Sequence, residues 1–140
     1  MDVKSFIKAA RLRTLPLSIS GIIVGSYLGV EYLNSILTTN SIKIVVWLTP
    51  IFWLAILTTI GFQVLSNFAN DYGDFVKGSD KNRTGEARMV SSGKITPKQM
   101  KMAMIITTII TLIIALLLIY VSFGKDNFGY SILFFVLGIA

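Results

Sequence analysis

The stretch Met102–Gly124 reads MAMIITTIITLIIALLLIYVSFG and contains no charged residue. A helix of about 20 apolar residues crosses the hydrocarbon core of a bilayer, so this stretch predicts a transmembrane helix. Further uncharged stretches are Thr14–Val30, Ile44–Asn70 and Asn127–Ala140. Only 14% of the chain is charged, whereas soluble domains carry about 25% charged residues. The composition therefore predicts an integral membrane protein.

The expected fold class is an all-α membrane protein, a transmembrane helix bundle formed by one domain over residues 1–140. We expect three complete helices and a fourth that is truncated, because its apolar run reaches the last residue. Their expected bounds are about 14–33, 44–74, 97–123 and 128–140, with a hydrophilic loop over 75–96.

Two short patterns refine this outline. Thr96 and Pro97, followed by Gln99, fit a capping box with proline in the first turn, which marks the start of the third helix. Residues 2–13 place apolar side chains at helical spacing between basic ones. This spacing predicts a short amphipathic helix that lies on the membrane surface.

Basic residues alternate between the two sides of the predicted bundle. They are dense before the first helix and between the second and third, whereas each of the other two loops holds a single lysine. The positive-inside rule then places the N-terminus and the long basic loop in the cytoplasm. The net charge of +6 follows this membrane pattern, so we do not expect a nucleic-acid partner.

The sequence has no cysteine and no histidine. This excludes thiol nucleophiles, imidazole bases, and metal sites that use thiolate or imidazole ligands. Chemistry must come from carboxylates, amides, cations and a hard metal ion.

A polar stripe lies at the end of the second predicted helix. Asn67, Asn70, Asp71 and Asp74 are three or four residues apart and so share one helix face, and Gln63 extends that face one turn deeper. Ionisable groups at membrane depth usually face a partner or a cavity. Oxygen ligands of this kind suit Mg²⁺, which completes its shell with water and substrate phosphate oxygens.

The loop that follows offers cations to a bound polyphosphate. Arginine binds phosphate oxygens in a bidentate fork, and lysine binds them as a point charge. The candidates are Lys77, Lys81, Arg83, Arg88 and Lys94. In the alternative interpretation, the same charges are interfacial and face anionic lipid headgroups.

The run Asn70-Asp71-x-x-Asp74 resembles the first aspartate-rich motif of the UbiA-type intramembrane prenyltransferases. The longer string from Asn67 through Lys77-Gly78-x-Asp80 to Arg83-x-Gly85-x-x-Arg88 is similar to the branch of that family that acts on 1,4-dihydroxy-2-naphthoate. The opening Arg11-Leu-Arg13-Thr14-Leu15-Pro16 is also similar to that branch. Family members carry a second aspartate-rich motif in their other half, so the chain resembles an N-terminal half.

The resemblance implies an activity and a set of roles. The activity is Mg²⁺-dependent transfer of a polyprenyl group from polyprenyl diphosphate to 1,4-dihydroxy-2-naphthoate, giving demethylmenaquinone in menaquinone biosynthesis in the bacterial inner membrane. Asp71, Asp74 and Arg88 would be catalytic. The metal ligands would be Asp71, Asp74, Asn67 and Asn70. The diphosphate would be bound by Asn67, Asn70, Lys77, Asp80, Arg83 and Lys94.

Other functions stay open at this stage. A segment of a cation-coupled transporter would also place Asp71 and Asp74 in a membrane helix, although a transport path needs polar groups deeper in the bilayer. A CDP-alcohol phosphotransferase-like enzyme uses aspartate-rich helix ends, but its longer Asp-Gly-x-x-Ala-Arg signature is missing. An inactive fragment is the remaining alternative.

Overall fold

The computed structural model describes residues 2–36, 49–79, 88–123 and 128–139, and every regular element in these ranges is helical. The elements are α1 (Val3–Ala10), the 3-10 turn η1 (Leu12–Thr14), α2 (Leu15–Ile36), α3 (Pro50–Lys77), α4 (Pro97–Phe123) and α5 (Phe128–Ile139). Three segments are long and apolar enough to cross a membrane: Val3–Leu33, Pro50–Lys77 and Pro97–Phe123. The predicted all-α membrane bundle is confirmed.

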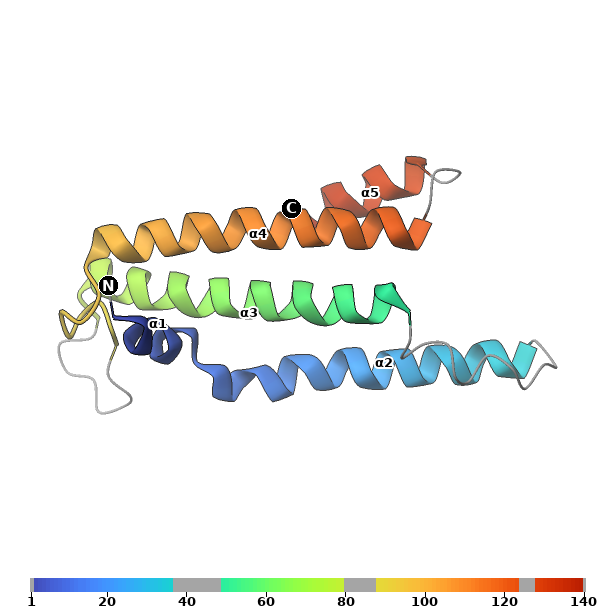
Figure 1. The fold of residues 1–140 in the computed structure, drawn as a ribbon, viewed down its shortest axis with the longest axis horizontal. Helices are drawn as coiled ribbons and strands as arrows, with labels where there is room; N and C mark the ends of the chain where they lie inside the picture. The colour runs from blue at the N-terminus through green and yellow to red at the C-terminus, as the bar shows by residue number, and fades with distance from the viewer. Residues whose placement is uncertain (1, 37–48, 80–87, 124–127, 140) are drawn as a thin grey trace.

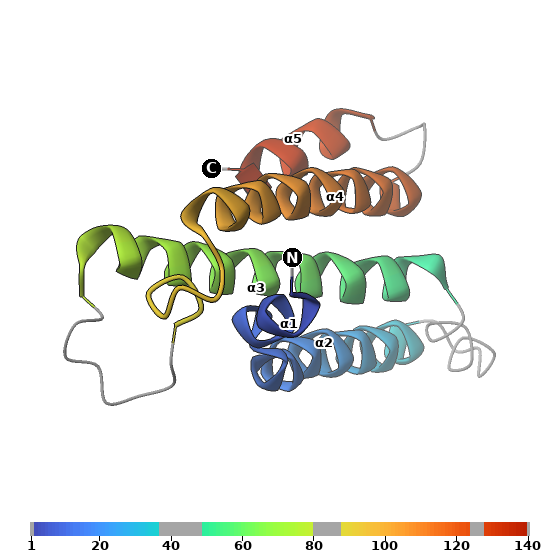
Figure 2. The ribbon, with the colours of Figure 1, turned by 60° about the vertical axis from the view of Figure 1, so that its left-hand side comes forward.

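Helix α3 is the central element of the bundle. It lies between α2 and α4 in both ribbon views, and it contacts α1, α2 and α4 (Figures 1 and 2). Helix α5 follows α4 and folds back beside it. The side chains of α3 therefore meet neighbours on several faces, which positions its polar stripe.

Helix α1 is short and lies across one end of the bundle. Its direction changes at Arg11, whose left-handed backbone (φ 49°) separates it from η1 and α2. Small side chains, Ala9 and Ala10, pack it against α3, whereas Val3 and Ile7 are half or more exposed. The predicted short helix is present, but its buried face is made mostly of small residues because the helices approach closely.

The start of α4 has the predicted capping box. The amide of Thr96 donates to Gln99 Oε1 at 3.0 Å, and the amide of Gln99 donates to Thr96 Oγ1 at 3.2 Å. Pro97 occupies the first helical position. Two amides that would lack helical partners are thereby satisfied.

The observed bounds of α3 differ from the expected 44–74. Thr49 has an extended backbone (ψ 140°), so the helix begins at Pro50, where a missing N–H costs nothing; residues 44–48 lie outside the described ranges. At the other end the helix continues to Lys77, and Gly78 ends it with a left-handed cap (φ 68°). Asp71 and Asp74 are therefore within the helix and not at its end.

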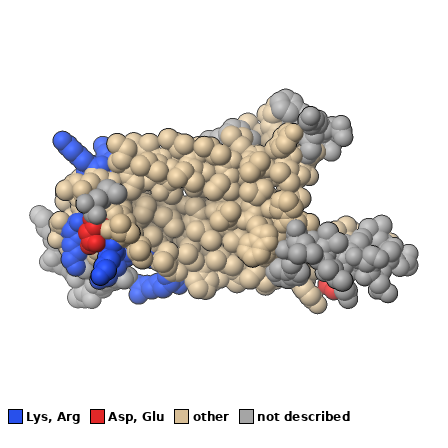
Figure 3. Space-filling model, in the orientation of Figure 1, with Lys and Arg blue, Asp and Glu red and all other residues tan. Residues whose placement is uncertain are grey.

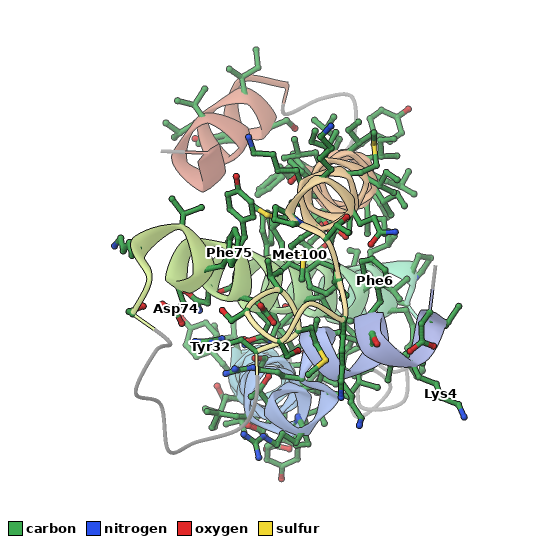
Figure 4. The ribbon with its side chains drawn as sticks, turned by 90° about the vertical axis from the view of Figure 1, so that its left-hand side faces the viewer. Lys4, Phe6, Tyr32, Asp74, Phe75 and Met100 are labelled. Atoms are coloured by element: carbon green, nitrogen blue, oxygen red, sulfur yellow. The ribbon has the colours of Figure 1, made fainter. Side chains whose placement is uncertain are left out.

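The buried core is concentrated at one end of the bundle. We call this the loop end, formed by α1, the last turns of α3, residues 88–96 and the first turns of α4. The core cluster consists of Ala9, Ala10, Phe68, Met89, Val90, Ile95 and Met100. Met100 lies between α3 and α4 in the view from this end (Figure 4), and most of the visible Lys, Arg, Asp and Glu side chains gather here (Figure 3).

Candidate active site at the loop end

The polar stripe of α3 is divided into a buried edge and an accessible edge. Asn67 and Asp71, one turn apart, are 6% and 1% exposed. Asn70 is exposed, and the side chain of Asp74 is 29% exposed. Residues on one helical face thus have different surroundings, because α1 and residues 88–96 cover only one side of the stripe.

Asp71 binds the backbone of the loop. One carboxylate oxygen accepts from the amide of Met89 at 2.9 Å, and the other accepts from the amide of Val90 at 3.0 Å. The carboxylate oxygens thus hold two consecutive backbone donors. Burial and these two contacts direct the charge of Asp71 toward the backbone of the loop. Its role as a metal ligand stays a prediction.

Asp74 forms an ion pair with Arg88. The Nη2 atom of Arg88 donates to Asp74 Oδ2. The Arg88 side chain is 7% exposed, so its charge is buried beside the carboxylate of Asp74. The structure therefore brings together two of the three predicted catalytic residues, Asp74 and Arg88, with Asp71 one turn away.

Asn67 joins a polar network between α3 and the α1–α2 junction. Its amide nitrogen donates to the carbonyl of Ala10 at 2.8 Å and to Thr14 Oγ1 at 3.2 Å. Gln63 continues the network, accepting from Ser18 Oγ at 2.7 Å. These contacts satisfy amide groups that would be costly to bury unpaired. The predicted role of Asn67 as a ligand stays a prediction.

Two of the remaining predicted site residues are exposed at the loop end, and the others lie outside the described ranges. Lys77 and Lys94 are exposed at the loop end, where they can meet an anion from solution. Lys81, Asp80 and Arg83 lie outside the described ranges. Lys101 of α4, which was not among the predicted site residues, lies with its Nζ 5.6 Å from the centre of the Tyr72 ring, a cation–π contact that joins α4 to α3.

The accessible edge suits a metal ion that arrives with a phosphate group. Asn70 and Asp74 are four residues apart and offer hard oxygen donors, which Mg²⁺ prefers. Among the described residues, no group of three or more acidic side chains is placed to hold a metal ion alone. Mg²⁺ commonly takes one or two carboxylates and completes its shell with water and phosphate oxygens, so the donor set fits.

Comparison with known proteins identifies the family. A family model described as "UbiA prenyltransferase family" matches residues 36–140, which is more than half of the chain. The chain belongs to this family. Its apolar helices and the polar stripe of α3 therefore belong to a prenyltransferase of this family.

Curated relatives agree with this assignment. The chain is 37% identical over 92% of its length to a protein of Haemophilus influenzae named 1,4-dihydroxy-2-naphthoate octaprenyltransferase. It is 38% identical over 93% of its length to the protein of the same name in Escherichia coli. The chain spans 40% of the length of the first relative and 39% of the length of the second. No solved structure matches the chain.

Sequence reasoning found the side chains of the site but missed several of their partners. The backbone amides of Met89 and Val90 and the carbonyl of Ala10 carry no sequence signature. Thr14 and Ser18 do carry a weak one, since two hydroxyl residues four apart in an apolar helix mark a polar face. That face meets Gln63 and Asn67 in the structure.

Proposed function

We propose that the protein transfers a polyprenyl group from polyprenyl diphosphate to 1,4-dihydroxy-2-naphthoate, in the step of menaquinone biosynthesis that leads to demethylmenaquinone. The observation that carries the proposal is the likeness of nearly the whole chain to two proteins named for this reaction. The pairing of Asp74 with Arg88 at the polar end of an apolar bundle supports it, because the substrate joins a charged diphosphate to a long apolar tail.

In this proposal, Asn70 and Asp74 hold Mg²⁺ beside the diphosphate. The metal, when bound, neutralises charge on the departing diphosphate. Arg88, now paired with Asp74, is within reach of the same group and stabilises its developing charge. Lys77 and Lys94 attract the anion from solution, and Asp80 and Arg83 keep their predicted roles in binding it.

The reaction then proceeds on the substrates. The bond between the allylic carbon and the diphosphate oxygen breaks, and its electron pair leaves with the diphosphate. The electron-rich ring carbon that bears the carboxylate attacks the allylic cation, and loss of carbon dioxide restores the aromatic ring. The product is the hydroquinone form of demethylmenaquinone. The apolar surface of the helices would accommodate the isoprenoid tail.

The proposed location is the bacterial inner membrane, with the loop end in the cytoplasm. The support is the concentration of basic side chains at that end (Figure 3). A reporter enzyme fused after Lys94 should be active in the cytoplasm, and one fused after Asn40 should be active outside it. The opposite pattern would contradict the orientation.

The activity is tested in membranes that contain the protein expressed from the complete reading frame that encodes these residues. Polyprenyl diphosphate, 1,4-dihydroxy-2-naphthoate and Mg²⁺ are added, and the prenylated product is measured by mass spectrometry. We expect product that disappears when EDTA removes the metal. Absence of product under all metal conditions would favour the inactive alternative.

The hydrogen bonds of the described residues do not favour the alternative of a cation-coupled transporter. The polar groups of α3 that lie deeper in the bundle, Gln63 and Asn67, are hydrogen-bonded to α1, η1 and α2. They serve as contacts between helices in the described part of the chain. An ion path through the described residues would have to break this network.

A further inference from the structure

The loop residues next to Arg88 form a compact turn. The amide of Ser92 donates to the carbonyl of Arg88 at 3.1 Å, and the amide of Gly93 donates to the carbonyl of Val90 at 2.9 Å. Gly93 has a left-handed backbone (φ 73°), which few other residues adopt without strain. The amide of Ile95 then donates to the carbonyl of Met89 at 3.0 Å. These contacts fold residues 88–95 back on themselves.

The apolar side chains of this turn pack into the core cluster of the loop end. Met89, Val90 and Ile95 are 5%, 2% and 1% exposed and belong to the core cluster. With the side chains of Met89 and Val90 directed into the core, their amides need acceptors inside the protein. Asp71 supplies both acceptors, one per carboxylate oxygen.

We propose that Asp71 is a positioning residue, which fixes the turn at Met89 and Val90 and thereby holds the adjacent Arg88 beside Asp74. Arg88 directly precedes Met89, so the contacts of Asp71 set the backbone from which the guanidinium extends. Both oxygens of Asp71 are used and the residue is 1% exposed. Its negative charge therefore faces the backbone of the loop, whereas Asn70 and Asp74 lie on the accessible edge of the stripe.

The two carboxylates of the aspartate-rich motif thus have different roles. Asp71 and Asp74 are three residues apart in α3, yet one faces backbone donors and the other faces an arginine. The structural part of the proposal, that Asp71 fixes the backbone at Met89 and Val90, can be tested without a substrate. Its consequence for diphosphate binding rests on the proposed function.

The structural part is tested by hydrogen exchange on the protein in lipid nanodiscs, with EDTA present so that no metal contributes. In the unsubstituted protein the amides of Met89 and Val90 should exchange slowly. Asp71→Asn should speed their exchange about tenfold or more, because hydrogen bonds to a charged acceptor are strong. Asp74→Asn, the same change one turn away, should leave these two amides protected.

Two outcomes would overturn the structural part. One is fast exchange of both amides in the unsubstituted protein, a measurement that needs no variant to fold. The other is unchanged protection in Asp71→Asn in metal-free protein, which a residue acting only as a metal ligand would give.

The functional part is tested by a double-mutant cycle with inorganic diphosphate as the probe, in the presence of Mg²⁺. Asp71→Asn and Arg88→Gln should each weaken diphosphate binding, and the double variant should bind no more weakly than Arg88→Gln alone. Additive losses would contradict action through Arg88. If the unsubstituted protein fails to bind diphosphate, the proposed function fails, while the exchange result still decides the role of Asp71.

Discussion

The loop end and the apolar length of the bundle are stabilised by different means. At the loop end, Asp71, Asn67 and Arg88 are buried beside a cluster of apolar side chains, and each has a defined polar partner. Along α2 and α4, large apolar side chains are exposed, among them Leu28 and Ile113. The hydrocarbon of a bilayer can solvate the exposed apolar side chains of α2 and α4, whereas the polar groups at the loop end need partners within the protein. Most of the buried side chains and buried polar contacts of this protein therefore lie at the end of the bundle that carries its charges.

The contrast predicts that an equal truncation has unequal effects in the two regions. Ile95 is 1% exposed in the core of the loop end, and Ile113 is 60% exposed on α4. Ile95→Ala should lower the free energy of unfolding by about 2–5 kcal/mol, through lost burial and a residual cavity. Ile113→Ala should change it far less. Unfolding in mixed micelles measures both, and equal losses would contradict a core concentrated at the loop end.

A second prediction concerns the accessible edge of the α3 stripe. Asp74→Asn keeps the shape of the side chain but removes the charge that faces Arg88. We expect prenyl transfer to fall about 100-fold or more, as is common when one electrostatic contact in an active site is lost. Membrane insertion should be unchanged.

The matched control for Asp74→Asn is Asp2→Asn, which makes the same change at the N-cap of α1. It should retain transfer activity. Near-normal activity in Asp74→Asn would contradict the assignment of Asp74, whereas loss of insertion would indicate a structural role.

A third prediction compares two glycines in the apolar length. A Cβ atom at Gly61 would lie 2.9 Å from Thr111 Cγ2 and closer still to Thr111 Oγ1, and Thr111 is 1% exposed. Gly61→Ala should therefore destabilise the contact between α3 and α4 by about 1–3 kcal/mol.

The matched variant for Gly61→Ala is Gly25→Ala. A Cβ at Gly25 meets no atom within 4 Å, so this change should be neutral or slightly stabilising, since alanine favours helix. Unfolding in mixed micelles separates the two variants. A large loss at Gly25 would show that the exposed face of α2 is packed against another surface in the membrane.

The smallest expected effect concerns α1. The Asp2 side chain accepts from Ser5 Oγ at 2.7 Å and from the amide of Lys4 at 3.1 Å, and these contacts lower the pKa of Asp2. Because the folded-state pKa is the lower one, the cap contributes above the ordinary aspartate pKa and is lost as pH falls through the folded value. The protection of the first α1 amides, measured against their intrinsic exchange rate at each pH, should fall slightly at acidic pH, and Asp2→Ala should remove this dependence.

Much of the fold followed from the sequence because its signals are local. The uncharged run after Met102 gave a helix with the expected bounds, and the box at Thr96 fixed its start. Helix α3 continues past the expected end at Asp74, because the left-handed cap at Gly78 ends it. The partners of Asp71 could not be predicted, since backbone amides 18 and 19 residues away leave no pattern.

The spans of these hydrogen bonds also bear on the order in which the bundle assembles. The contacts of Asp71 close loops of 18 and 19 residues, whereas the bond from Asn67 to Ala10 joins residues 57 apart. Short loops close at lower entropic cost and on average faster. We therefore expect α3, the turn and α4 to form first as a helical hairpin, with α1 and α2 docking later through Gln63 and Asn67. A ribosome that has released only α1 and α2 into the bilayer would hold two helices whose polar partners have not yet been synthesised.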